Sequence, residues 1–139
     1  MAANIVQHPR GGQKKIALRD NWFQLVVPSS LDPARQMNSL YYGTDTLAGS
    51  SGSPVCTDQW FVVAVHRGGV PQTTMIDGVE VIVRKDGTPA REGDSKYSIA
   101  YRANEGTRVS RIFASLRALA AGPDAAVASA AAAALERIT

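Results

Sequence analysis

Cysteine is nearly missing from this chain, and two other absences narrow what the protein can be. The single cysteine, Cys56, excludes an internal disulfide and agrees with a reducing compartment. No charged-then-apolar leader follows Met1, and no apolar run is long enough to span a bilayer. We therefore expect a cytoplasmic protein without a membrane partner.

Signals for bound ions, phosphates and nucleic acids are also scarce. Two distant histidines and one cysteine do not form a metal-ligand set. The segment PRGGQ (residues 9–13) lacks the spacing and the Lys-Ser ending of a P-loop. The fifteen basic residues give a net charge of +3, but they are scattered rather than grouped with aromatics. We expect no metal, no cofactor and no nucleic-acid partner.

The chain does contain many short β-type segments separated by glycine and proline turns. Its 139 residues, 45% of them hydrophobic, suit one compact domain with its own core. No helical pattern lies between the segments, which indicates a small antiparallel barrel or sandwich. Asp86-Gly87 is a hairpin signal. The predicted strands are residues 4–8, 14–18, 22–27, 40–42, 54–56, 60–66, 79–84 and 97–101.

The hydrophobic period becomes helical near Thr107. Apolar residues between positions 109 and 120 recur at helical spacing, with Thr107 or Asn104 as the cap and Gly122-Pro123 as the stop. The following residues, 124–139, are rich in alanine, which favours helix but buries little surface. They predict a marginal helix capped by Asp124 or a linker. We therefore divide the chain into a domain at 1–120 and a tail at 121–139.

The segment GSSGSP (residues 49–54) is either a flexible linker or a tight turn. A linker would continue in glycine and serine with polar flanks, whereas Pro54-Val55 and an apolar strand follow at once. A tight turn that presents one hydroxyl is the better prediction.

With its flanks, this segment carries a family resemblance. GSSGSPV resembles the GDSGGPV-type serine loop of chymotrypsin-fold peptidases, and is closer to the GNSGSPVF form of the bacterial glutamyl endopeptidases. AVHRGG, which contains His66 fifteen residues after Ser51, is similar to the IHWGG segment of that branch. Residues 5–21, 41–55 and 103–116 also resemble bacterial trypsin-like domains, so the resemblance covers about residues 4–116.

The resemblance implies a fold and a nucleophile. The fold would be mainly β, a single antiparallel barrel equivalent to the second barrel of the trypsin-like double-barrel fold, followed by a C-terminal α-helix and the Ala-rich tail. Ser51 would be the catalytic nucleophile, and the N–H groups of Gly49 and Ser51 would form the oxyanion hole. Gly49 would let its amide turn inward, while Gly52 and Ser53 would let neighbouring backbone pass close behind the loop.

The substrate-binding residues follow from the same resemblance. His66 would line the specificity pocket with Thr46 rather than act as the base; the alternative is a buried histidine satisfied by local hydrogen bonds. Asp45 lies where trypsin-type enzymes select Lys or Arg, but a turn-stabilising role is equally open. Acidic and basic preferences both remain, with acidic or small residues favoured. Arg67-Gly68-Gly69 would be an edge strand that pairs with substrate backbone.

Two departures from the family matter. Ser50 replaces the usual aspartate or asparagine and has no charge with which to capture a new amino terminus. The family's catalytic histidine and aspartate precede the serine on the first barrel, and they have no counterpart here. The resemblance places the remaining histidine, His8, on a second-barrel strand or its edge, and His8 is a weak candidate for the base.

Three hypotheses follow. The chain is part of a serine endopeptidase acting on protein or peptide substrates, truncated at its N-terminus, with the missing N-terminal barrel supplied in cis or in trans. Alternatively, it is a truncated or inactive peptidase homologue that survives as a peptide-binding module. The third hypothesis is a small β-barrel unrelated to proteolysis. A lone second barrel would expose the apolar face that normally packs on the first.

Overall fold

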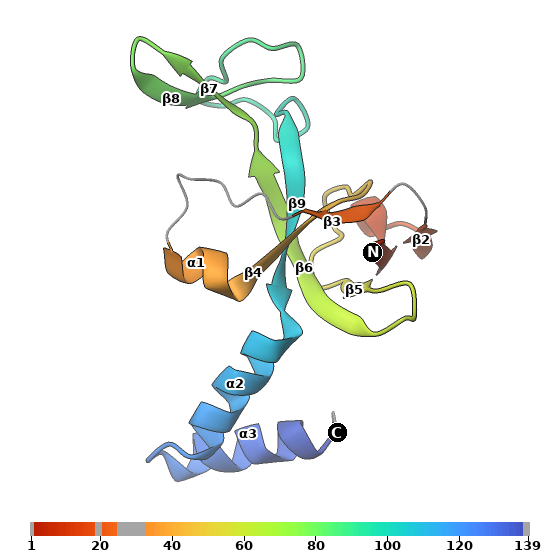
Figure 1. The fold of residues 1–139 in the computed structure, drawn as a ribbon, viewed down its shortest axis with the longest axis vertical. Helices are drawn as coiled ribbons and strands as arrows, with labels where there is room; N and C mark the ends of the chain where they lie inside the picture. The colour runs from red at the N-terminus through yellow and green to blue at the C-terminus, as the bar shows by residue number, and fades with distance from the viewer. Residues whose placement is uncertain (1, 19–20, 25–32, 138–139) are drawn as a thin grey trace.

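The computed structural model describes residues 2–18, 21–24 and 33–137 of the chain. A curled sheet occupies the middle of the molecule, a two-stranded hairpin projects at one end, and two helices lie at the other (Figure 1). A short 3-10 helix, η1 (Pro9–Gly11), follows the first strand. The strands and α-helices within these residues are β1 Asn4–Gln7, β2 Lys15–Ala17, β3 Trp22–Gln24, α1 Pro33–Asn38, β4 Ser39–Gly43, β5 Pro54–Cys56, β6 Val62–Pro71, β7 Thr73–Ile76, β8 Val79–Ile82, β9 Tyr101–Arg108, α2 Val109–Ala120 and α3 Ala125–Glu136.

Seven strands form one antiparallel sheet in the order β2-β1-β5-β6-β9-β4-β3, and β7 and β8 form a separate hairpin. The residues before β1 reach β3 through an antiparallel bridge between Ala2 and Trp22. A hydrogen bond of 3.1 Å from the Ala3 N–H to the Asn21 carbonyl supports this bridge. The protein is therefore mainly β, a curled antiparallel sheet followed by C-terminal helices.

The core is formed by side chains from several strands of this sheet. One cluster joins small and branched side chains of several strands around the Tyr42 ring: Ala3, Ile5, Tyr42, Val55 and Ala64. In β6, Ala64 and His66 are buried while their neighbours are more exposed, as expected when alternate residues face opposite sides of a sheet. His66 therefore points to the same side as the core.

Most of the predicted strands are confirmed. Residues 4–8, 14–18, 40–42 and 54–56 correspond to β1, β2, β4 and β5. The strand predicted over 22–27 is β3 as far as Gln24, and residues 25–27 lie outside the described part. The strand predicted from Trp60 begins two residues late, because Trp60 has a φ of +64° in a turn, and it continues to Pro71.

Two β-hairpin turns contain Asp-Gly. The predicted turn at Asp86-Gly87 is confirmed by a 2.8 Å bond from the Arg84 N–H to the Thr88 carbonyl. Its first strand is shorter than expected, since β8 ends at Ile82. The sequence analysis missed the second turn, Asp77-Gly78, where φ values of +50° and +78° join β7 to β8.

Three predictions are wrong. Of the strand predicted at 97–101, residues 97 and 98 form a turn, Ile99 forms an isolated bridge with Arg84, and Tyr101 is the first residue of β9, the last strand of the sheet. Asn104 and Thr107 lie inside β9, so neither caps α2; its cap residue is Arg108, without a side-chain hydrogen bond. The expectation of no helix between the strands fails at α1, a helix of six residues before β4.

The alanine-rich tail is a helix. α2 ends before Gly122-Pro123, as predicted, and α3 turns back to pack against α2 (Figure 1). The predicted Asp124 cap is confirmed, since its carboxylate accepts 3.0 Å bonds from the N–H groups of Ala126 and Val127. None of the described helices has the length and apolar character needed to cross a membrane.

Apolar surface is exposed at the turn between β5 and β6. Trp60, Phe61 and Val62 are consecutive and are 50%, 70% and 48% exposed. Contiguous exposed apolar side chains of this kind are uncommon on monomeric soluble proteins, because contact with water is unfavourable for apolar surface.

Candidate functional site

Ser51 lies in a tight double turn between β4 and β5. The Ser50 N–H donates to the Leu47 carbonyl and the Ser53 N–H donates to the Ser50 carbonyl, both at 3.1 Å. Gly49 and Gly52 have φ values of +98° and +88°, a region that favours glycine. The glycine-serine segment is therefore a defined turn rather than a linker.

Two N–H groups of this turn have no acceptor in the part of the chain that the structure describes. The N–H groups of Ser50, Gly52 and Ser53 each donate to a backbone carbonyl. Among the residues described, those of Gly49 and Ser51 donate to none. They are the two amides that the sequence predicts as oxyanion donors, and they flank Ser50 on either side.

The two glycines of the turn serve different purposes. A Cβ on Gly49 would lie 2.9 Å from the Gly11 nitrogen and 3.2 Å from the His8 carbonyl oxygen, so the segment at η1 passes directly against it. Nothing lies within 4 Å of a Cβ built on Gly52. The prediction that Gly52 admits close backbone is therefore wrong: its positive φ is what requires glycine, and the close approach is at Gly49.

The turn is fastened to β6. The Gly52 N–H donates to the His66 carbonyl, and the His66 N–H donates to the Ser53 carbonyl, both at 2.8 Å. The Ser51 side chain is exposed, with its Oγ 3.5 Å from the Arg67 carbonyl oxygen. The backbone of His66 thus fixes the two residues that follow Ser51.

Ser50 fastens the same turn to β1. Its buried hydroxyl donates to Oε1 of Gln7 at 2.6 Å, and Nε2 of Gln7 donates to the Asp45 carbonyl at 2.7 Å. The Ser50 hydroxyl therefore links the turn to β1 without adding a charge. The sequence analysis did not single out Gln7.

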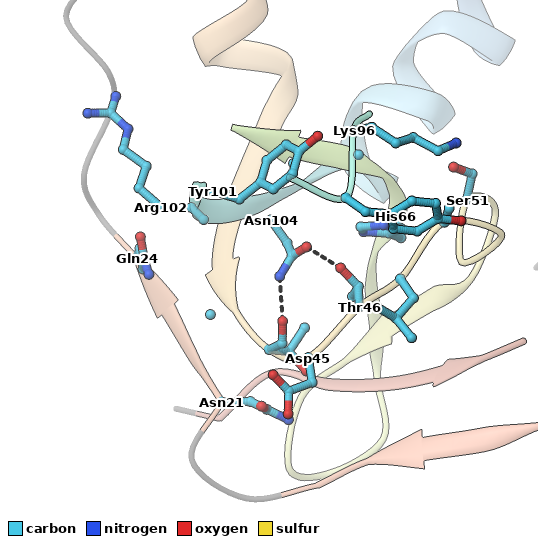
Figure 2. Close-up of a pocket in the computed structure, with 18 of the residues that line it drawn as sticks. Asn21, Gln24, Asp45, Thr46, Ser51, His66, Lys96, Tyr101, Arg102 and Asn104 are labelled. Carbon is cyan, nitrogen blue, oxygen red and sulfur yellow. Dashed lines mark hydrogen bonds between the residues drawn. The ribbon is translucent and has the colours of Figure 1, made fainter. Parts of the chain in front are cut away.

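A cavity of about 850 Å³ brings most of the predicted site residues together (Figure 2). Its lining includes Asp45, Thr46, Ser51, His66 and Gly68. Gly49 and Arg67 are not part of the lining. A cavity of this size is sufficient for a side chain or a small ligand.

His66 is both buried and part of this lining. Only 4% of the residue is exposed, and its Nδ1 lies 2.6 Å from the hydroxyl of Tyr42. Burial lowers the pKa of the His66 imidazole below its usual value. The imidazole is therefore neutral at pH 7 and has a local hydrogen-bond partner, while still reaching the cavity.

Asn104 is a polar lining residue that the sequence analysis mistook for a helix cap. The Thr46 hydroxyl donates to Oδ1 of Asn104, and Nδ2 of Asn104 donates to the Thr44 carbonyl at 2.6 Å (Figure 2). The amide thus ties β9 to the segment that precedes the serine turn. Asn104 lies in β9, whose residues are not typical of a strand, so the sequence contains no clear sign of its place in the cavity.

The charges around the cavity are mainly positive. Lys85, Lys96 and Arg102 line it, against one carboxylate, that of the exposed Asp45. The sequence analysis missed all three cations, since they come from turns and a strand far from Ser51 in sequence. With the imidazole neutral, the lining carries more positive than negative charge, which favours an anionic ligand.

The predicted edge strand is only partly an edge. β5 pairs with β6 from Val62 to Val65, and from Gly68 to Pro71 the described partner of β6 is β9 alone. The Arg67 side chain is turned toward a buried carboxylate, with its NH2 group 3.7 Å from Oε1 of Glu105. Backbone pairing with a peptide is therefore open to Gly68-Gly69, and the Arg67 side chain is occupied elsewhere.

No general base lies beside Ser51 in the described part of the chain. The ring of the exposed His8 has its Nδ1 3.0 Å from the Gly12 carbonyl oxygen. The Ser51 hydroxyl has no histidine or carboxylate within hydrogen-bonding distance among these residues. The same residues contain no group of three His, Cys, Asp or Glu side chains that could hold a metal ion.

Comparisons with known proteins reveal two relatives among curated proteins. The uncharacterized protein y4fB of Sinorhizobium fredii (strain NBRC 101917 / NGR234) is 42% identical over 125 residues, 87% of this chain. The secreted RxLR effector protein 73 of Plasmopara viticola is 39% identical over 74 residues, 51% of this chain. The aligned region is 18% of each relative's length, so the chain spans less than a fifth of the proteins it matches. No family model and no solved structure matches the chain.

Proposed function

We propose that this chain is the nucleophile-bearing barrel of a serine endopeptidase. One observation carries the proposal: an exposed serine at the rim of a cavity, on a fixed turn whose two unpaired amides are those of Gly49 and Ser51. Unpaired N–H groups beside a nucleophile are what an oxyanion requires, and such a donor contributes about 3–4 kcal/mol to transition-state stabilisation.

The reaction divides between this chain and a missing part. Ser51 Oγ would attack the peptide carbonyl carbon while a base removes the hydroxyl proton. The amides of Gly49 and Ser51 would stabilise the carbonyl oxygen as it gains negative charge. The proton would pass to the leaving amine, and water would then hydrolyse the acyl-enzyme. Because a serine hydroxyl is a weak nucleophile without a base, the base must come from a first barrel in cis or in trans.

The cavity favours a substrate with an acidic side chain before the scissile bond. Lys85 and Lys96 give the lining positive charge, and His66 is available for hydrogen bonding. Hydrogen bonds to an ionised carboxylate are about twice as strong as those between neutral groups. Asp45 is exposed and opposes this preference, although more cations than carboxylates line the cavity.

The lengths of the relatives are compatible with a longer enzyme. In both, the region that resembles this chain is 18% of the whole. Such proteins have room for a first barrel in the same chain. Neither relative's name states an activity, so the peptidase assignment depends on the residues and geometry given above.

The test uses the native protein. Its intact mass and amino-terminal sequence would show whether a histidine and an aspartate precede this region in the same product. A fluorophosphonate probe should label Ser51 in that product, and Ser51→Ala should abolish labelling and peptide cleavage. Ser115→Ala, an exposed serine of α2, is the matched control and should leave both unchanged. Labelling that survives Ser51→Ala would contradict the proposal.

A second function is a peptide-binding module without catalysis. The observation that favours it is the hydrogen-bonding environment of Ser51, whose described partner is the Arg67 carbonyl rather than a base. In that case the native product would neither react with the probe nor cleave peptides, yet would bind peptides at the cavity in a calorimetric titration.

A further inference from the structure

A second cavity, of about 380 Å³, lies where the end of α1, β6, β9 and α2 come together. Its lining includes two arginines, Arg67 of β6 and Arg111 of α2, and the polar side chains of Asn38 and Thr107. None of the described residues that line it is Asp or Glu. The positive charge of the two arginines is therefore not balanced within the cavity.

Arg67 lies between two residues of the first cavity but faces the second. His66 and Gly68 line the cavity beside Ser51, whereas Arg67 lines the other. This agrees with the rule that alternate residues of a strand point to opposite sides of a sheet. The two cavities therefore lie on different faces of the sheet and share β6 as a wall.

The ion pair between Arg67 and Glu105 leaves the hydrogen-bond donors of Arg67 available. Its NH2 group is 3.7 Å from Oε1 of Glu105, beyond hydrogen-bonding distance, and half of the side chain is exposed. The carboxylate already accepts hydrogen bonds from Arg35 and Ser39. Glu105 thus attracts Arg67 without accepting a hydrogen bond from it, and the guanidinium can still donate to a ligand.

Arg111 is unpaired in the part of the chain that the structure describes. Its side chain is exposed in the first turn of α2 and has no hydrogen-bond or ion-pair partner among these residues. Two half-buried apolar residues one turn apart, Ile112 and Leu116, line the cavity with it. Guanidinium groups beside an apolar wall suit an aliphatic side chain that ends in a carboxylate, since arginine matches a carboxylate with paired N–H donors.

We propose that this second cavity binds an acidic side chain of a peptide, and that Arg67 and Arg111 recognise its carboxylate. The inference rests on the proposed function, because it assumes that a peptide pairs with β6 at Gly68-Gly69. Neighbouring side chains of such an extended peptide point to opposite faces. When the residue before the scissile bond enters the first cavity, the residue that precedes it therefore faces Arg67.

Peptide binding to the full chain, measured by calorimetry, tests this selection without any need for catalysis. All peptides end with the same glutamate, so no peptide bond follows the residue that enters the first cavity. The residue before it is either glutamate or glutamine. We expect the glutamate form to bind about tenfold more tightly, since one hydrogen bond to a charged group contributes about that much. The preference should decrease at high salt, because both arginines are accessible to solvent.

A second pair of peptides separates the cavity from general attraction to a basic protein. In this pair, glutamate or glutamine stands two residues before the terminal glutamate, where the side chain points away from Arg67. The two forms should bind alike, although their charges differ as in the first pair. Equal preferences in both pairs, or no preference in the first pair, would overturn the proposal.

Arginine variants assign the preference to the cavity. Arg111→Gln and Arg67→Gln should each remove most of it. Arg117→Gln makes the same charge change at an exposed arginine of α2 outside the cavity, and should leave the preference unchanged. Arg67 also attracts the buried Glu105, so Arg111→Gln decides the outcome if Arg67→Gln does not fold. A full preference retained in Arg111→Gln would contradict the proposal.

NMR of the arginine side chains locates the ligand. When the glutamate peptide is added to the full chain, the Nε–Hε signals of Arg67 and Arg111 should shift, whereas that of Arg117 should not. Binding without these shifts would overturn the role of the second cavity and leave peptide binding at the first cavity intact. Binding of none of the peptides would overturn both, while labelling of Ser51 by the fluorophosphonate probe would still test catalysis separately.

Discussion

Gly106 illustrates how one missing side chain shapes the site. A Cβ at this position would lie 3.0 Å from Cβ of Ala64 and 3.1 Å from the Val65 carbonyl oxygen, in addition to its contact with the Tyr42 ring. These neighbours belong to two different strands and are buried or part-buried. Because Gly106 has no side chain, the Tyr42 ring can pack against β9 at this position and reach His66.

Gly106→Ala should lower the free energy of unfolding by about 1–3 kcal/mol, because overfilling a packed core forces its neighbours apart. Urea denaturation followed by circular dichroism measures the change. Gly68→Ala is the control: nothing lies within 4 Å of a Cβ at Gly68 and its φ is not in the left-handed region. A loss of stability in Gly68→Ala equal to that in Gly106→Ala would contradict this account.

At the residue scale, the sequence predicted the serine turn because its signal is local. Consecutive glycines and serines before Pro54 specify a turn without reference to the remaining chain. The Tyr42–His66 contact and the Thr46–Asn104 contact are different, since each joins residues that are far apart in sequence. No local pattern predicts which strands bring them together.

At the scale of elements, α3 depends on its cap. Its twelve residues are mostly alanine, and Ala131 is the one the structure gives as buried. Since alanine buries little surface, intrinsic propensity and the Asp124 cap contribute a large share of the stability of this helix.

Asp124→Ala should destabilise α3 by about 1 kcal/mol, because two N–H groups lose their acceptor. Helix content measured by circular dichroism should fall, and amide exchange should accelerate in residues 125–136. Asp124→Ser retains a capping oxygen and should restore most of the protection. Unchanged exchange in the alanine variant would mean that packing on α2, not the cap, holds the helix.

The strand that the sequence analysis missed, β9, explains the limits of sequence patterns for elements. Its residues, YRANEGTR, include Asn, Glu and Gly, which are depleted in strands. They form a strand because β6 and β4 pair with them on both sides. The helical pattern of α2 begins directly after Arg108, where β9 ends. The strand and the helix are therefore hard to separate in the sequence, and the helix cap was predicted too early in the chain. Where pairing between distant strands overrides propensity, the sequence alone does not show it.

At the scale of the whole molecule, a buried carboxylate connects four elements. Glu105 of β9 is 1% exposed and accepts bonds of 3.0 Å and 2.5 Å from Arg35 of α1 and 2.6 Å from Ser39 of β4. Arg67 of β6 lies 3.7 Å away. Burial alone would raise the pKa of Glu105, but the hydrogen bonds from Arg35 and Ser39 and the two positive charges outweigh it and lower the pKa.

The sign of the pH dependence follows. A carboxyl group whose pKa is lower when folded stabilises the fold fully above its unfolded pKa, about 4.5, and this contribution is lost as pH falls through the folded value. Arg35→Met should lower the free energy of unfolding at pH 7 by about 1–3 kcal/mol, since a buried carboxylate loses a main partner. Denaturation at pH 7 and at pH 3 should show the deficit shrinking in acid. Arg111→Met, on the exposed side of α2, is the control; a deficit independent of pH would contradict the charge argument.

The place of β9 in the sheet also has a consequence for how the protein is made. Among the strands of this sheet, β9 is the last to leave the ribosome, yet it lies between β6 and β4 in the order β2-β1-β5-β6-β9-β4-β3. Without β9, the described strands of this sheet form two parts, β2-β1-β5-β6 and β4-β3, which the bridge between Ala2 and Trp22 connects at one end. Until residue 108 has emerged, β6 and β4 each have an unpaired edge that favours association with other chains. The serine turn, which is fastened to β6, can form early. The cavity cannot, because Asn104 and Gly106, beside which the Tyr42 ring packs, both belong to β9. A nascent chain therefore forms the Ser51 turn before it forms the cavity.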